Sequence, residues 1–114
     1  MPRARRPYWN LGRLRQIAKD VRRIQVYKKR CVQFFGGDYQ RAVRVASAAI
    51  QALSESNFSE TKKQVWDMVD VYGVEINKRG WLLKVCIEDD AIVHVISLHP
   101  LEYRIRTNGG WIEL

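Results

Sequence analysis

Residues 81–106 constrain the fold most strongly, because they hold two long apolar runs with almost nothing between them. The runs read WLLKVCIE and AIVHVISL, and both are rich in β-branched and aromatic residues. Since only the acidic pair Asp89-Asp90 separates them, the stretch predicts two strands joined as a β-hairpin. Directly after the second run comes a cluster of polar residues: His99, Glu102, Tyr103, Arg104 and Arg106. Side chains at a strand end are held by the scaffold and still reach solvent, so this cluster is a candidate site.

Further strands are predicted on both sides of this hairpin. The segment QVWDMVDVYGVEI precedes it and is joined to it by the turn residues Asn77-Lys78-Arg79-Gly80. Together these segments predict a three-stranded antiparallel meander. The C-terminal residues TNGGWIEL, with a turn at Asn108-Gly109-Gly110, offer a short additional edge strand.

The first half of the chain has helical periodicity. Asn10 is placed to cap a basic amphipathic helix, and Asp38 to cap the clearest helix of the chain, YQRAVRVASAAIQAL. The segment RIQVYKKRCVQFFGG between them is ambiguous, with β-branched residues first and helical spacing later, and we favour a helix ending at Gly36-Gly37. Residues 54–63 are polar and predict a loop with one possible helical turn.

Helices followed by strands indicate an α+β fold, with N-terminal helices packed on a C-terminal antiparallel sheet. The 114 residues suit a single domain over 10–114, preceded by a flexible basic arm over 1–9 that orders on a partner. No apolar run approaches the roughly 20 residues of a bilayer span, and the N-terminus lacks the apolar core of a secretory signal. We therefore expect a soluble cytoplasmic protein, with Cys31 and Cys86 as buried thiols.

Charge is strongly polarised along the chain. Thirteen of the 20 Lys and Arg residues lie in residues 1–44, where the only acidic residues are Asp20 and Asp38. Residues 45–114 hold the other seven cations and ten acidic residues. A one-sided cationic surface attracts polyanions, so nucleic acid is the expected partner, although basic residues also serve simply to solvate helices.

Four segments suggest a family. In order along the chain they are Leu53-Ser54-Glu55-Ser56-Asn57-Phe58, Asp70-Val71-Tyr72, Leu83-Lys84 and Val95-Ile96-Ser97-Leu98. Their order and spacing over roughly residues 40–99 resemble the MqsR-like mRNA interferase toxins. This resemblance implies a small RelE-like endoribonuclease from a toxin–antitoxin pair, with single-stranded mRNA as substrate, either free or on the ribosome, and a cognate antitoxin protein as partner.

The sequence also departs from that family at its catalytic positions. Glu60 and His99 stand where the family has lysines, Val69 where it has glutamine, and Leu82 where it has tyrosine. The catalytic set of the family is therefore not carried over residue by residue. Either the site has been rebuilt around His99 and the following tail, or the nuclease chemistry has been lost.

The residues themselves suit RNA cleavage without a metal or cofactor, which needs a base, a cation for the phosphate and an acid. A histidine titrates near neutral pH, so His99 is the candidate base or acid. Arg104 and Arg106 are candidate phosphate ligands, Tyr103 a proton donor or stacking residue, and Lys84 a cation from the neighbouring strand. The alternative is that His99 is only a turn residue before Pro100 and that the other residues lie on an edge without a catalytic role.

A second set of residues is predicted to hold RNA. It comprises Arg3, Arg5, Arg6, Arg13, Arg15, Lys62, Lys63 and Tyr72. His94 is predicted to be structural, because alternation in a continuous strand turns it away from His99 unless a bulge intervenes. Two other functions stay open: a non-catalytic RNA- or DNA-binding module, and an interaction protein that docks a partner through its arm and C-terminal tail.

Overall fold

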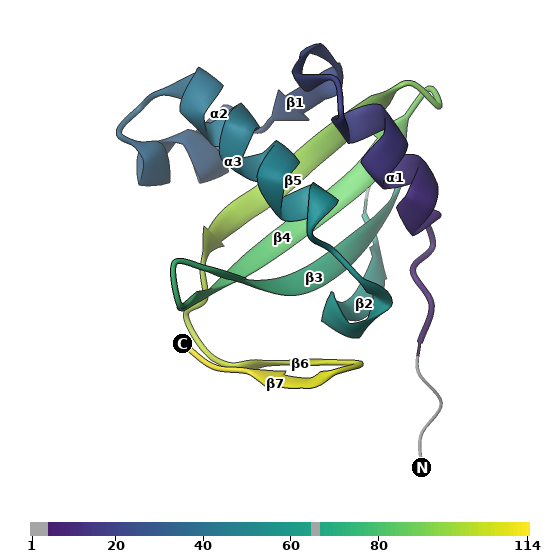
Figure 1. Ribbon diagram of the computed structural model, residues 1–114, viewed down its shortest axis with the longest axis vertical. Helices are drawn as coiled ribbons and strands as arrows, with labels where there is room; N and C mark the ends of the chain where they lie inside the picture. Colours follow the sequence, from purple (N-terminus) through teal and green to yellow (C-terminus); the bar gives the residue numbers. More distant parts are fainter. Residues whose placement is uncertain (1–4, 65–66) are drawn as a thin grey trace.

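The computed structural model describes residues 5–64 and 67–114, and only the backbone of Lys28 and Arg30. Two helices, α1 (Leu11–Ala18) and α3 (Tyr39–Gln51), pack on one face of a five-stranded sheet of order β1-β5-β4-β3-β2 (Figure 1). The strands are β1 (Ile24–Val26), β2 (Phe58–Lys63), β3 (Met68–Ile76), β4 (Arg79–Glu88) and β5 (Ile92–Pro100). Single-turn elements are η1 (Val21–Arg23), α2 (Lys28–Cys31), η2 (Val32–Phe35) and η3 (Glu55–Asn57). The predicted α+β class is confirmed.

The predicted meander is present, and it is longer than expected. Strands β2 to β5 pair antiparallel in sequence order, so the meander has four strands. Asn77 and Lys78 make the turn between β3 and β4 with positive φ angles of 51° and 65°. Such a two-residue turn matches the twist of the strands that it joins, which is why the connection is so short.

Two strands of the main sheet were not predicted, and each has a physical reason. The three residues of β1 pair in parallel with β5 through Ile24–Val93 and Val26–Val95, at the start of a segment predicted as helical. Three residues carry too little alternation to outweigh the helical spacing that follows. The strand β2 was predicted as a loop because, apart from Phe58, it is polar, as suits a charged edge strand.

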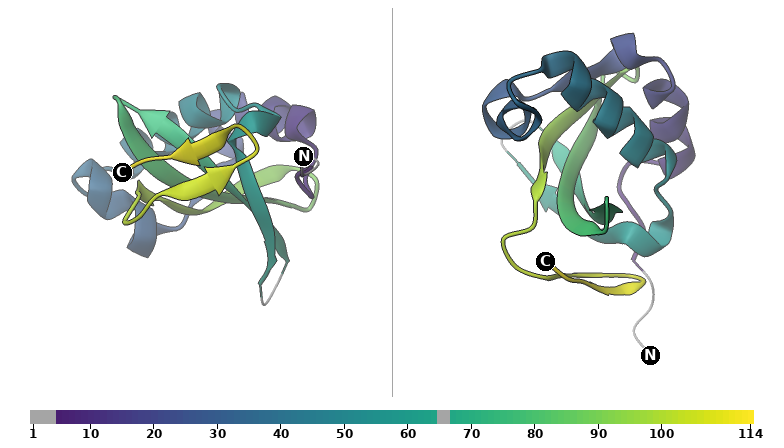
Figure 2. Two further views of the ribbon diagram at one scale, coloured as in Figure 1. Left: turned by 90° about the horizontal axis from the view of Figure 1, so that it is seen from below. Right: turned by 60° about the vertical axis from the view of Figure 1, so that its left-hand side comes forward.

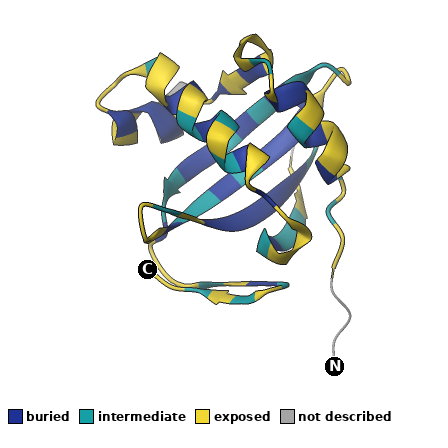
Figure 3. Ribbon diagram, in the orientation of Figure 1, coloured by how far each residue is buried: buried dark blue, intermediate teal, exposed yellow. Residues whose placement is uncertain are grey.

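The core lies between the helices and the sheet (Figure 3). Asp38 and Asn10 cap α3 and α1 as predicted, because their side chains accept from the backbone N–H groups of Arg41 and Arg13. The fully buried side chains include Leu14, Ile17, Ile50, Leu83, Val85, Val93, Val95 and Leu98. Cys31 and Cys86 are buried thiols, in agreement with the sequence prediction. No helix within the described residues is long and apolar enough to cross a membrane.

A β-bulge interrupts the second strand of the central hairpin. Lys84 pairs with Ser97 and the adjacent Val85 pairs with Val95, so Ile96 is the extra residue on β5. Core residues Val95 and Leu98 therefore both face the helices, although they are three positions apart and a regular strand would turn them to opposite faces. The prediction that alternation places His94 and His99 on opposite faces is wrong, since the bulge puts both on the face away from the helices.

The last part of the chain does not extend the main sheet. Instead β6 (Ile105–Thr107) and β7 (Gly110–Ile112) form a separate two-stranded sheet, which crosses the end of the molecule below β3 and β4 (Figures 1 and 2). A Cβ atom added to Gly73 would stand 2.9 Å from the Ile105 side chain, and one added to Gly80 only 2.2 Å from the carbonyl oxygen of Glu113. Both glycines lie on the face away from the helices, so this small hairpin covers one end of that face.

The described part of the N-terminal arm lies against the domain. The backbone N–H groups of Tyr8 and Trp9 donate to the carboxylate of Asp70, at 3.0 and 2.8 Å, and Trp9 Nε1 donates to the Met68 carbonyl at 2.8 Å. Asp70 is fully buried and accepts a third bond from Thr61 Oγ1 at 2.6 Å. Tyr8 and Trp9, which belong to the predicted basic arm, are thus held against the domain itself by their backbone N–H groups and by the Trp9 indole, while the Tyr8 side chain stays exposed.

Candidate active site

The face of the sheet away from the helices, here called the open face, is the natural place for a site. Strand register places Lys62 on β2, Lys84 on β4, and His94 and His99 on β5 together on this face. The hairpin β6–β7 covers it near Gly73, whereas its other end near His94 is not covered by that hairpin. Among the pockets lined by described residues, one lies at each end of this face, and a third lies beside β1 with Gln25, Lys29 and His94 in its lining.

The pocket next to the hairpin, here called the His99 pocket, has a volume of about 190 Å³. Its lining residues are Leu82, Lys84, His99, Leu101, Glu102, Tyr103 and Ile105. Three of the five predicted catalytic residues, His99, Lys84 and Tyr103, thus meet in one small cavity. They come from β5, β4 and the connection to β6, so the bulge and the hairpin together assemble the group.

His99 has a defined ring orientation. It lies inside β5 and not beyond it, because the strand continues to Pro100, which corrects the predicted strand end. Its Nδ1 is 2.8 Å from the Pro100 carbonyl oxygen, which can only accept a hydrogen bond. In the neutral ring Nδ1 therefore carries the proton, and Nε2 keeps its lone pair. A neutral histidine in this tautomer is prepared to take a proton at Nε2.

The two predicted phosphate ligands lie outside this pocket. The guanidinium of Arg104 is 4.1 Å from the ring centroid of Trp111, and its Nη1 is 3.9 Å from Glu113 Oε1. Arg106 pairs with Trp111 across the small hairpin, whereas the alternate residue Ile105 faces Gly73. Arg104 and Arg106 thus belong to the outer side of that hairpin. The cation that the structure brings to His99 is Lys84.

The pocket at the other end of the open face is acidic. It has a volume of about 350 Å³, and Asp67, Glu88 and Asp89 line it together with His94 and Cys86. Burial first, and then the carboxylates of Asp67 and Glu88, raises the pKa of the Cys86 thiol to about 11. Cys86 is therefore a neutral thiol at pH 7 and a poor nucleophile. Three carboxylates also make this end unfavourable for phosphate.

The predicted RNA-binding residues divide into three groups. Arg5, Arg6, Lys62 and Lys63 are exposed. Arg13 and Arg15 contact the domain itself: Arg13 Nη2 donates to the Asp90 carbonyl at 2.7 Å, and Arg15 Nη1 to the Leu53 carbonyl at 2.6 Å. Tyr72 is fully buried against Phe58, so its predicted stacking on an RNA base is wrong. Arg3 lies outside the described residues.

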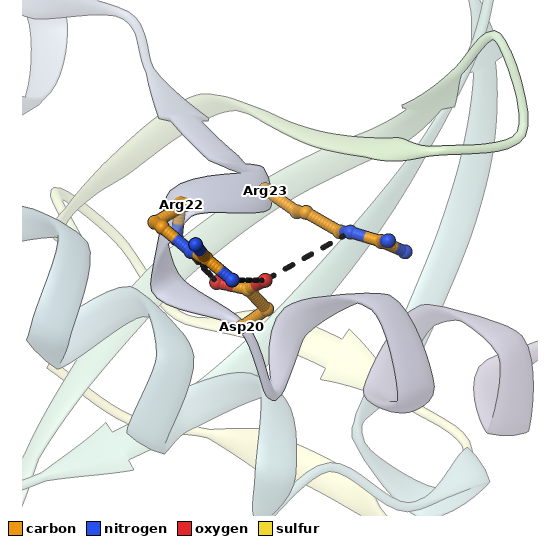
Figure 4. Close-up of polar contacts among 3 residues, drawn as sticks. All are labelled: Asp20, Arg22 and Arg23. Carbon is orange, nitrogen blue, oxygen red and sulfur yellow. Dashed lines mark hydrogen bonds and ion pairs between the residues drawn. The ribbon is translucent and has the colours of Figure 1, made fainter.

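Some of the cationic charge of the N-terminal half is paired locally. Arg22 makes two bonds to the carboxylate of Asp20, at 3.0 and 2.9 Å, and Arg23 approaches the same group at 3.9 Å (Figure 4). The hydrogen bonds from Arg22 lower the pKa of the Asp20 carboxyl. This cluster at η1 therefore offers less free charge than the sequence suggests.

Sequence reasoning missed two residues near His99. Glu102 was part of the polar cluster, yet it was given no role, and it lines the pocket as a carboxylate. Phe34 lies with its ring centroid 6.1 Å from that of His99. Phe34 follows Gln33 in the segment predicted as a helix, and its helical spacing with other apolar residues gave no signal of exposure.

No protein-family model and no curated protein matches this chain. Within the described residues, no group of three or more His, Cys, Asp and Glu side chains is arranged to hold a metal ion.

Proposed function

We propose that this protein is a toxin-type endoribonuclease that cleaves single-stranded RNA by acid–base chemistry in the His99 pocket. The observation that carries the proposal is the meeting of His99, Lys84, Tyr103 and Glu102 in one small open cavity. These side chains supply a base, a cation and a proton donor within one site. The resemblance to the MqsR-like toxins and the open antiparallel face, which suits a RelE-like fold, support the same function.

The roles follow from the chemistry of each group. His99 Nε2 takes the proton of a ribose 2′-hydroxyl, and the 2′-oxygen then attacks the adjacent phosphorus. The Lys84 ammonium stabilises the charge that grows on the non-bridging phosphate oxygens. Tyr103 gives a proton to the departing 5′-oxygen. The bond to that oxygen breaks, leaving a 2′,3′-cyclic phosphate and a free 5′-hydroxyl.

A cleavage assay with chosen substrates tests this proposal. The purified protein is incubated with a single-stranded RNA in excess EDTA, alongside an RNA carrying one 2′-deoxy nucleotide at the cleaved position. We expect cleavage in EDTA, a cyclic phosphate at the new 3′ end, and no cleavage at the deoxy position. Cleavage of the deoxy substrate, or cleavage that EDTA abolishes, would exclude attack by the 2′-oxygen without a metal.

A cognate antitoxin is part of the proposal, because an unrestrained cytoplasmic nuclease of this kind would damage its own host. The net charge of +8 favours an acidic inhibitor protein. We expect the protein to be toxic when produced alone and to co-purify with a protein encoded next to it. Production at high level in active form, with no partner and no toxicity, would count against the toxin assignment.

A non-catalytic nucleic-acid-binding module is the second candidate. Arg104 and Arg106 favour it, because they are cations on the outer side of the small hairpin, away from the His99 pocket. Binding of RNA with no cleavage under any condition would favour this function. An interaction protein that docks a partner chain would instead bind no RNA at all.

A further inference from the structure

An aromatic ring lies partly exposed beside His99, outside the residues that line the His99 pocket. Phe34 on η2 is 43% exposed, whereas the next residue, Phe35, is only 6% exposed. The ring centroids of Phe34 and His99 are 6.1 Å apart, at an interplanar angle of 38°. Phe34 therefore offers apolar aromatic surface to solvent directly next to the proposed proton-transfer residue.

The Phe34 ring is held in place by its neighbours. Its edge meets Trp81 at a centroid distance of 6.4 Å, and Phe35 packs on the same indole at 5.6 Å. The segment ends at Gly36, whose φ of 65° closes η2 in the left-handed conformation. Because the ring is already oriented by packing, it loses little side-chain freedom when a planar group stacks on it.

The charges on the open face indicate the direction in which a bound strand runs. At the His94 end, Asp67, Glu88 and Asp89 repel phosphate. At the His99 end, Lys84 attracts phosphate. Lys29 is exposed on α2, which packs beside β5, and it lines a further pocket with Gln25, Tyr27 and His94 next to β1. A strand held at His99 is therefore favoured to continue over the edge of β5 toward η2 and α2, across Phe34.

We infer that Phe34 is a stacking platform for the base next to the nucleotide held at His99. This inference rests on the proposed function, and it names the ligand as unpaired nucleic acid. Every base has an aromatic face, so such a platform tolerates any sequence. It also selects single strands, because a base inside a duplex is already stacked and cannot reach the ring.

The test measures binding, so that it does not depend on cleavage. A series of short, non-cleavable 2′-O-methyl oligonucleotides, each with one abasic position, is titrated against the wild-type protein and the Phe34→Ala, Phe34→Leu and Phe34→Trp variants. Tyr8→Ala is the matched control, since Tyr8 is also an exposed aromatic residue and lies on the anchored N-terminal segment. Circular dichroism and thermal melting establish that each variant is folded.

We expect Phe34→Ala to weaken binding about tenfold or more, Phe34→Trp to retain it, and Tyr8→Ala to leave it unchanged. One abasic position should weaken wild-type binding by a similar factor and have no effect on Phe34→Ala. If Phe34→Ala does not fold, Phe34→Leu keeps the packing on Trp81 and should show a smaller loss at the same abasic position.

Two outcomes separate this inference from the proposed function. Equal binding by the wild-type protein and a folded Phe34 variant, or a loss that is the same for intact and abasic oligonucleotides, would overturn the stacking role alone. A wild-type protein that binds no single-stranded oligonucleotide would overturn both.

Discussion

Asp70 and Tyr72 lie two residues apart on β3, and both are fully buried, but their polar groups differ in hydrogen bonding. Asp70 accepts three hydrogen bonds, whereas the Tyr72 hydroxyl has no hydrogen-bond partner within the described residues. Burial, and then the negative charge of Asp70, raises the pKa of Tyr72 well above its usual range. The Tyr72 hydroxyl therefore stays neutral, and its removal from water without a hydrogen-bond partner lowers the stability of the fold.

We predict that Tyr72→Phe is neutral or stabilises the fold by about 1 kcal/mol at pH 7, because it removes a buried hydroxyl without breaking a hydrogen bond. In the unfolded chain tyrosine ionises near pH 10, while folded Tyr72 resists ionisation, so its contribution to stability falls as pH rises above about 10. Urea denaturation at pH 7 and pH 10.5 should show a smaller decline in the free energy of unfolding for Tyr72→Phe than for the wild-type protein. A clear loss of stability at pH 7 would mean that the hydroxyl is bonded after all.

Among the elements, the N-terminal segment is held at the backbone of Tyr8 and Trp9 by one buried carboxylate, that of Asp70. In the Asp70→Asn variant, an amide NH2 group takes the place of one carboxylate oxygen. This NH2 group would face an N–H donor and could not accept its hydrogen bond. We predict a loss of about 3 kcal/mol in the free energy of unfolding, as expected for breaking a buried charged network. Thr61→Val removes only one of the three donors and should cost about 1 kcal/mol. Equal losses in the two variants, measured in urea, would show that the segment is not held by Asp70.

The small hairpin β6–β7 depends on glycine where it crosses the sheet. A Cβ on Gly80 would meet the Glu113 backbone oxygen at 2.2 Å, which cannot be relieved by a rotamer change. We predict that Gly80→Ala destabilises the protein by about 2 kcal/mol and displaces the hairpin. Gly37→Ala is a control without steric contact, since no atom lies within 4 Å there, although its φ of 81° also disfavours alanine. A Gly80→Ala variant as stable as the wild-type protein would contradict this packing.

The elements that could be predicted from sequence are those with strong local signals. The helix α3 has an aspartate cap and an apolar stripe, and β3, β4 and β5 are long and rich in β-branched residues. The parallel strand β1, the polar edge strand β2 and the bulge at Ile96 depend on contacts between distant residues. No local pattern encodes such contacts, so these features were missed.

The same reasoning explains the partial prediction of the site. His99, Tyr103 and Lys84 were found because polar groups beside an apolar hairpin are conspicuous in a sequence. Arg104 was placed with them because it is close along the chain, but the turn into β6 carries it to Trp111. Phe34 is far from His99 in sequence and reaches it only because α2 and η2 pack beside β5.

At the scale of the whole molecule, the cations differ in their freedom to bind a polyanion. Lys62 and Lys63 are exposed on β2, which projects with β3 beyond the body of the domain (Figure 2). We predict that replacing both by Gln makes the binding of single-stranded RNA less dependent on salt. The slope of the logarithm of the binding constant against the logarithm of the salt concentration should decrease in magnitude by about 1.4, or about 0.7 for each lost phosphate contact. Arg22→Gln, at the Asp20 cluster, should change the slope less. Equal changes would show that RNA does not use the β2 edge.

The most direct test of the central claim compares the two histidines of the open face. His99→Ala and His94→Gln are assayed for cleavage of one RNA over a range of pH, with folding checked by thermal melting. We predict that His99→Ala lowers the turnover rate about 10²–10⁴-fold and removes one limb of the pH–rate profile, whereas His94→Gln keeps most of the activity. A folded His99→Ala protein with nearly full activity, together with an inactive His94→Gln protein, would contradict the account and move the site to the other end of the sheet.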